Sequence, residues 1–170
     1  SIQTRLLVGA DAPLSRGAKK AGISGKREIL TAFGEDVKGY KGKDTHVDLF
    51  VGSELAPRFF GWGIPTGPNE GRIGIATTLP HKPMPFFRDY FLKGAPSKLL
   101  GGAKIINLIS GLIPFGVASP SYTDNIILTG DAAGMAKPTS GGGFYSGLIS
   151  ADAAVEVASK ALNSGDLSSV

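Results

Sequence analysis

The chain has 170 residues, which is enough for one sizeable hydrophobic core but short for two full domains. Hydrophobic residues make up 42% of it, which excludes a disordered chain, and the lack of cysteine excludes disulfides, iron–sulfur clusters and thiol catalysis. The two histidines have no metal-ligand spacing, and the net charge of +4 comes without interleaved aromatic residues, so we expect neither a metal site nor a nucleic-acid partner.

An apolar strand and a short basic helix are predicted at the start of the chain. The strand covers residues 5–9 and leads into Gly9-Ala10-Asp11, and the helix runs from about Ser15 to Ala21, with Gly22 as its stop. A strand-to-helix turn that binds no ligand would have the same pattern.

Short apolar or alternating segments separated by tight turns follow over residues 28–78, which predicts an antiparallel sheet. Within it, alternation places Phe60, Trp62 and Ile64 on one face of a strand. That face could form an apolar wall for a greasy substrate or a flat ring, or it could pack the core, and the pattern fits both.

The next stretch returns to helix and strand. Residues 80–85 are a proline-rich linker, residues 86–93 are predicted as a helix with an aromatic core stripe, and residues 104–109 are predicted as a strand. The most apolar run, Ile105–Val117, is too short and too often interrupted to cross a bilayer, although it could line a pocket or touch a membrane surface. We therefore expect a cytoplasmic protein, with peripheral membrane contact as an option.

The most informative stretch is the last one. The apolar run from Ile126 ends in Gly130-Asp131, which predicts a buried strand with a carboxylate at its tip. A loop with Pro138 follows, and three glycines at 141–143 open a long alanine-rich helix whose predicted apolar stripe is Leu148, Ala151, Val155, Ala158 and Leu162. Glycines let the backbone approach a flat or phosphorylated ligand, and free N–H groups at the helix start favour negative charge.

This pattern closely resembles the second flavin motif of glutathione-reductase-type FAD oxidoreductases, and above all that of geranylgeranyl reductases of isoprenoid and archaeal lipid metabolism. The resemblance implies FAD as the cofactor, with Asp131 on its ribityl chain and the helix start facing the pyrimidine edge of the flavin. It implies these cofactor-binding residues in the stretch: Gly130, Asp131, Pro138, Gly141, Gly142 and Gly143.

Two other stretches resemble the same family. Asp11 and Arg16, with Ser15 between them, match a conserved-aspartate motif, which implies a place near the pyrophosphate and ribose. Ala12 stands where the family has glycine, so a positive φ there would strain the backbone. Pro57, Phe60, Trp62 and Pro65 match a strand signature in which Ile64 replaces phenylalanine, and the resemblance implies that Phe60 and Trp62 flank a prenyl chain.

The implied fold class is α+β, a partial FAD/NAD(P)-binding flavoprotein fold with an α/β FAD-domain portion and an antiparallel substrate-domain sheet. Residues 1–25 and 119–170 would belong to the FAD domain and residues 26–118 to the substrate domain. No G-x-G-x-x-G pattern is present, so we expect an internal fragment of a longer protein. Its exposed strand edges would favour self-association or a swapped dimer.

Two functions follow from these patterns. The first is part of an FAD-dependent reductase that saturates isoprenoid lipids, with its catalytic residues and electron donor unassigned; an electron-transfer-flavoprotein dehydrogenase-like protein or an FAD-dependent hydroxylase is the close alternative. The second is a cofactor-free, inert fragment or lipid-binding module, which is the behaviour we expect of the isolated chain because the ADP-binding glycine pattern is missing.

Overall fold

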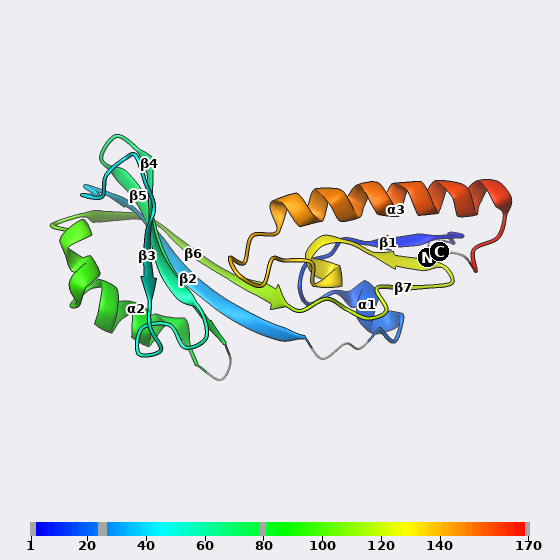
Figure 1. Ribbon diagram of the computed structural model, residues 1–170, viewed down its shortest axis with the longest axis horizontal. Coiled ribbons are helices and arrows are strands. Elements are labelled where there is room, and N and C mark those ends of the chain that lie inside the picture. Colours follow the sequence, from blue (N-terminus) through cyan, green and yellow to red (C-terminus); the bar gives the residue numbers. More distant parts are fainter. Residues whose placement is uncertain (1–2, 24–26, 79–80, 169–170) are drawn as a thin grey trace. The chain divides into compact units, whose positions relative to one another are not determined.

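The computed structural model describes residues 3–23, 27–78 and 81–168 (Figure 1). The chain divides into two compact units, unit 1 with Ser1–Ile29 and Ile113–Val170, and unit 2 with Leu30–Leu112. The predicted domain boundary at residues 25 and 26 and the first residue of the predicted linker, Pro80, lie outside the described residues.

Unit 1 contains a three-stranded sheet in the order β1-β8-β7. β1 (Leu7–Gly9) runs parallel to β8 (Ile126–Leu128), and β7 (Tyr122–Thr123) pairs antiparallel with β8. The pairing extends beyond the strands, because the Thr129 N–H donates to the Gly9 carbonyl at 3.0 Å. The loops that follow β1 and β8 therefore begin at the same edge of the sheet.

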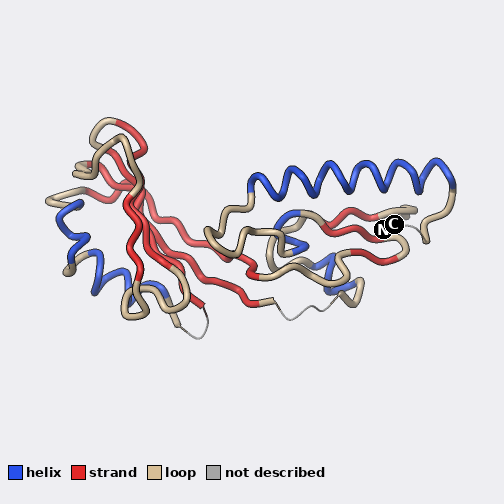
Figure 2. Tube along the Cα trace, in the orientation of Figure 1, coloured by secondary structure: helices blue, strands red, loops and turns tan. Residues whose placement is uncertain are grey.

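Three helical elements complete unit 1. α1 (Arg16–Lys20) ends at Ala21 and is followed by Gly22 at φ +69°, as the sequence predicts. η2 (Gly130–Ala133) is a short 3-10 turn directly after β8. α3 (Phe144–Ser164) starts from Gly143 and ends at Gly165 in the left-handed region, and it lies along the strands of unit 1 (Figure 2).

The predicted apolar stripe of α3 is not the face that the helix buries, although its member Ala158 lies on the buried side. Ala154 and Ala161 are the buried residues of this helix, and they pack with Ala158 against Ile127 of β8. Leu148 and Val155, assigned to the stripe, are 54% and 65% exposed. Small side chains let the helix backbone come close to the sheet, so the alanines face it and the larger apolar residues point away.

Unit 2 is built on a five-stranded sheet in the order β3-β4-β5-β2-β6. The pairs β2–β5, β3–β4 and β4–β5 are antiparallel, which confirms the predicted sheet. The strands are β2 (Glu28–Lys38), β3 (Asp48–Val51), β4 (Phe60–Gly67), β5 (Glu70–Thr78) and β6 (Lys104–Phe115).

Two predicted boundaries in unit 2 were wrong. α2 (Pro83–Phe91) begins inside the predicted linker, because proline is well suited to the first turn of a helix, and η1 (Ala95–Leu99) follows it. β6 runs to Phe115 instead of ending at Ile109. It includes Pro114, which is tolerated because β6 lies at the edge of the sheet, where one missing N–H breaks no central ladder.

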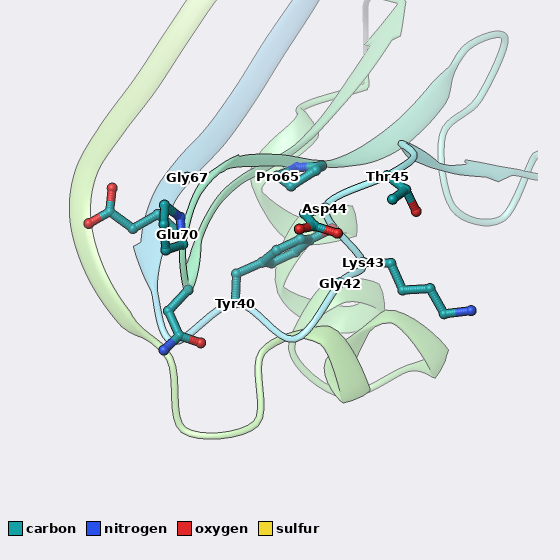
Figure 3. Close-up of a pocket in the computed structure, with 10 residues that line it drawn as sticks. Tyr40, Gly42, Lys43, Asp44, Thr45, Pro65, Gly67 and Glu70 are labelled. Carbon is teal, nitrogen blue, oxygen red and sulfur yellow. The ribbon is translucent and has the colours of Figure 1, made fainter.

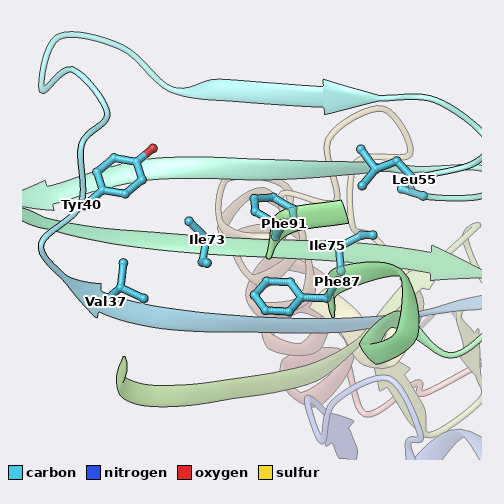
Figure 4. Close-up of a cluster of buried hydrophobic side chains, with 8 residues drawn as sticks. Val37, Tyr40, Leu55, Ile73, Ile75, Phe87 and Phe91 are labelled. Carbon is cyan, nitrogen blue, oxygen red and sulfur yellow. The ribbon is translucent and has the colours of Figure 1, made fainter. Parts of the chain in front are cut away.

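The core of unit 2 lies between α2 and one face of the sheet (Figure 4). Phe87 and Phe91 are fully buried and stack with ring centroids 5.1 Å apart, and Phe33 of β2 packs edge-on to Phe87 at 5.0 Å. This confirms the predicted core role of the helix aromatics. The sheet contributes small residues at the contact, since a Cβ added to Gly61 would lie 2.9 Å from the Phe91 ring.

Candidate functional site

Asp131 lies in the η2 turn that follows β8, where the sequence places a ligand-binding carboxylate. Gly130 at φ +56° and Gly134 at φ +73° shape this turn, and both angles favour glycine. Asp131 is half-buried, yet among the described residues no group donates a hydrogen bond to its carboxylate. Its oxygens are therefore open to hydroxyl groups of a ligand.

The start of α3 lies directly against this carboxylate. A Cβ added to Gly143 would lie 3.1 Å from Asp131 Oδ1, so glycine keeps the space between them open. Gly143 is also the N-cap of α3, and it offers no side chain to the first-turn N–H groups of the helix. A ligand with hydroxyls beside an electron-rich edge would fit this pairing of acceptor and donors.

The loop between η2 and α3 holds the other predicted residues. Its closing bonds run from the Lys137 N–H to the Gly142 carbonyl at 3.0 Å and from the Gly141 N–H to the Lys137 carbonyl at 2.8 Å. Pro138 lies exposed in the turn that these bonds close, and Gly141 has φ +68°. The six predicted residues of this stretch thus belong to one continuous loop, of which Asp131 and Gly143 are brought together.

The sequence interpretation missed two residues that anchor the loop. Ser150 of α3 accepts a hydrogen bond from the Gly130 N–H at 3.1 Å and shares one with the Thr129 hydroxyl at 2.7 Å. Arg27 donates from Nη1 to the Ala132 carbonyl at 2.7 Å. Neither residue belongs to a local motif, because the partners are 20 and 105 positions away, and only the fold brings them together.

Asp11 has a different environment from Asp131. Its carboxylate accepts hydrogen bonds from the Ser15 hydroxyl at 2.5 Å and from the backbone N–H groups of Arg16 and Gly17 at 2.8 and 3.2 Å. The Ser15 bond is the main reason that the pKa of Asp11 is lowered. Asp11 therefore helps Ser15, the N-cap residue, to cap the start of α1, and the Arg16 side chain is exposed beside it.

Ala12 has φ +68°, the positive value anticipated for the position where the resembled family has glycine. This conformation costs an alanine about 1 kcal/mol. The hydrogen bonds that Asp11 accepts from Ser15, Arg16 and Gly17 hold this loop and offset that cost.

Phe60 and Trp62 belong to unit 2, whereas the other eight candidate residues belong to unit 1. They lie on the sheet face opposite α2, are half-buried, and are not members of the buried core. Phe60 stacks on Phe59 at 4.3 Å and meets Trp62 edge-on at 6.2 Å. The indole covers Gly74, where an added Cβ would overlap it. The result is a partly exposed aromatic wall.

A separate hollow of about 620 Å³ lies at the β4–β5 turn of unit 2 (Figure 3). Tyr40, Lys43, Asp44 and Glu70 are among its lining residues, and none of the predicted site residues is. Burial, followed by the Asp48 carboxylate, raises the pKa of Tyr40 to about 12. The Tyr40 hydroxyl donates to Asp48 at 3.5 Å, so its polar group is already engaged.

Among the described residues, no group of three or more histidine, aspartate or glutamate side chains could hold a metal ion. Within residues 3–23, 27–78 and 81–168, no helix is long and apolar enough to span a membrane.

No protein-family model matches the chain. An uncharacterized protein of Methanocaldococcus jannaschii is 32% identical over 167 residues, covering 96% of the chain and 42% of that protein. Digeranylgeranylglycerophospholipid reductase 2 of Methanococcoides burtonii is 28% identical over 177 residues, covering 98% of the chain and 42% of the reductase. The chain therefore spans about 42% of the length of these curated relatives.

A solved structure, that of a geranylgeranyl bacteriochlorophyll reductase-like protein from Thermoplasma acidophilum, matches with a TM-score of 0.85 at 24% identity. The match covers 98% of the chain and 43% of that protein. The fold is thus a mixed α+β portion of the FAD-dependent oxidoreductase fold, which confirms the predicted fold class.

Proposed function

Because the chain is a homologue of the digeranylgeranylglycerophospholipid reductases and related geranylgeranyl reductase-like flavoproteins, we propose that it supplies flavin and substrate contacts in an FAD-dependent reduction of isoprenoid lipids. Unit 1 would be its part of the FAD domain and unit 2 its part of the substrate domain. When bound, the flavin would supply the electrons for saturating a carbon–carbon double bond.

The observation that carries this proposal is the pairing of Asp131 with Gly143. The Asp131 carboxylate would accept hydrogen bonds from the ribityl hydroxyls, and the first-turn N–H groups of α3 would face the pyrimidine edge. Gly130, Pro138, Gly141 and Gly142 would hold the loop around the cofactor. Because a Cβ at position 143 would crowd Asp131 Oδ1 at 3.1 Å, glycine would let the backbone approach the ligand here.

Asp11 would act on the cofactor through the loop that it organises. Since its carboxylate oxygens bond to Ser15, Arg16 and Gly17, it would position the start of α1. The exposed Arg16 guanidinium would then be the group that meets the pyrophosphate.

Phe60 and Trp62 would flank the prenyl chain. Their half-buried rings lie on one face of the unit 2 sheet. They present an apolar surface, which suits a hydrocarbon chain because such a chain forms no hydrogen bonds. No proton donor for the substrate carbon is assigned among these residues.

Flavin binding by the chain tests the proposal. The protein is incubated with FAD and desalted, and the retained flavin is read from its visible absorption. The proposal requires the wild type to retain flavin despite the missing ADP-binding glycine pattern. It also requires Asp131→Ala to retain at least tenfold less, and the control Asp124→Ala, at an exposed carboxylate of the β7–β8 turn, to match the wild type. A colourless wild type, or equal retention by both variants, would overturn the proposal for this chain.

A cofactor-free lipid-binding role is the second candidate. It is favoured by a groove of about 420 Å³ in unit 1 whose lining includes Ile127, Met135, Ala154 and Val157. Binding of a fluorescent prenyl lipid without flavin, unchanged in Asp131→Ala and lost when Ala154 is replaced by Trp, would identify this role. Oxygen consumption coupled to substrate hydroxylation would instead indicate the hydroxylase alternative.

A further inference from the structure

One segment of unit 2 carries a net positive charge. Residues 82–104 contain five basic residues and one acidic residue, so this segment alone carries a charge of +4, which equals the net charge of the whole chain. Its one acidic residue, Asp89, is paired with Lys93 at 2.8 Å. The remainder of the chain is neutral in total, although residues 16–27 hold five basic residues and no acidic one.

The same segment exposes apolar side chains on the outer face of α2. Phe87 and Phe91 point inward to the core, whereas Met84 and Leu92 are 38% and 50% exposed. Met84, Pro85, Asp89, Leu92 and Lys93 together line a shallow hollow of about 640 Å³ on that outer face.

The edge strand β6 adds to this apolar surface. Phe33 of β2 faces α2, so Asp36, three residues on, lies on the opposite face, where Arg72 donates hydrogen bonds to it and the Asn107 side chain helps to lower the pKa of its carboxyl group. Alternation then places the neighbours of Asn107, Ile106 and Leu108, on the α2 side. They are 57% and 61% exposed.

We group the exposed apolar residues and lysines of α2, of the segment that follows it and of β6 under one name, the α2 surface. Four of them are exposed apolar side chains and four are exposed lysines: Met84, Leu92, Ile106, Leu108, Lys82, Lys93, Lys98 and Lys104.

We propose that the α2 surface binds the face of an anionic phospholipid bilayer. Each lysine would lay its aliphatic stem beside the apolar side chains and direct its ammonium group to a lipid phosphate. A protein partner fits less well, because the centres of protein interfaces are poor in lysine and rich in aromatic residues, and this surface has the reverse composition. The proposal does not depend on flavin binding.

Vesicle flotation without flavin tests it. We expect the chain to float with phosphatidylglycerol vesicles at low salt, to release as the salt is raised, and to bind phosphatidylcholine vesicles at least tenfold less. Each lysine near an anionic surface contributes about fivefold to binding, so Lys98→Glu with Lys104→Glu should reduce it by about 25-fold or more.

The matched control reverses the same amount of charge elsewhere. Lys19→Glu with Lys20→Glu changes α1 of unit 1, and we expect it to leave vesicle binding within about threefold of the wild type. Leu92→Ser should weaken binding about tenfold, whereas Val155→Ser, at a 65% exposed position of α3, should not. All these side chains are exposed, and circular dichroism would verify that the variants are folded.

Three results would overturn the proposal. The first is an equal loss of vesicle binding in the two double-lysine variants. The second is equal binding of the wild type to neutral and anionic vesicles, and the third is no binding of the wild type to either kind of vesicle. A dimer that forms without lipid and is abolished by Leu92→Ser would assign the α2 surface to a second copy of the chain instead.

Discussion

Gly143 lies so close to Asp131 that a single added carbon would crowd the carboxylate, at 3.1 Å from Oδ1. The two residues come from different elements, η2 and the N-cap of α3. Because such a contact is tighter than most real Cβ contacts, a side chain here must displace either the carboxylate or the start of the helix.

Gly143→Ala should therefore lower flavin affinity about tenfold, which is about 1.4 kcal/mol, with little effect on folding. The measurement is an FAD titration followed by fluorescence. Gly147→Ala is the control, because nothing lies within 4 Å of its added Cβ, and it should stabilise α3 by about 1 kcal/mol. Unchanged affinity in Gly143→Ala would remove the Asp131–Gly143 pair from the proposed site.

Gly74→Ala should displace Trp62 from the sheet. The added methyl group would overlap the indole, so we expect a red-shifted emission and a loss of about 1–3 kcal/mol in the free energy of unfolding. Trp62 is the single tryptophan of the chain, so its fluorescence reports this site alone. Gly111→Ala in β6 meets no atom within 4 Å and should leave the spectrum unchanged.

Asp11 should make stability depend on pH. Its pKa is lowered in the folded state, so the carboxylate contributes stability above its ordinary pKa of 3.8, and this contribution is lost as the pH falls through the lower folded value. Asp11→Asn removes the titrating group, so its melting temperature should fall less than that of the wild type between pH 6 and about pH 3. An equal fall in the melting temperature of the wild type and of Asp11→Asn over this pH range would contradict the capping role of Asp11.

Ala12→Gly should be tolerated better than the neighbouring change Ala10→Gly. Glycine relieves the φ of +68° at position 12 but raises the entropy of the unfolded chain at both positions. Ala10 is outside the positive-φ region, so only the entropy cost applies there. We expect urea unfolding to give Ala12→Gly a free energy of unfolding about 1–2 kcal/mol above that of Ala10→Gly, and equal values would mean that position 12 carries no strain.

Much of the fold follows from local patterns. The strand, glycine-rich loop and long helix around Asp131 were predictable because an apolar run, three glycines and a terminal Gly165 each act over a few residues. The antiparallel strands of unit 2 were predictable from alternation and turn residues, and the core role of Phe87 and Phe91 followed from helical spacing.

Other features are properties of the tertiary structure alone. The sequence does not distinguish the two carboxylates, because what makes Asp11 a helix cap and leaves Asp131 open is which donors the folded loops bring near them. The same holds for Ser150 and Arg27, whose partners are remote in sequence. α3 buries its alanines because the close packing of a helix on a sheet selects side chains by size, which hydrophobic periodicity does not measure.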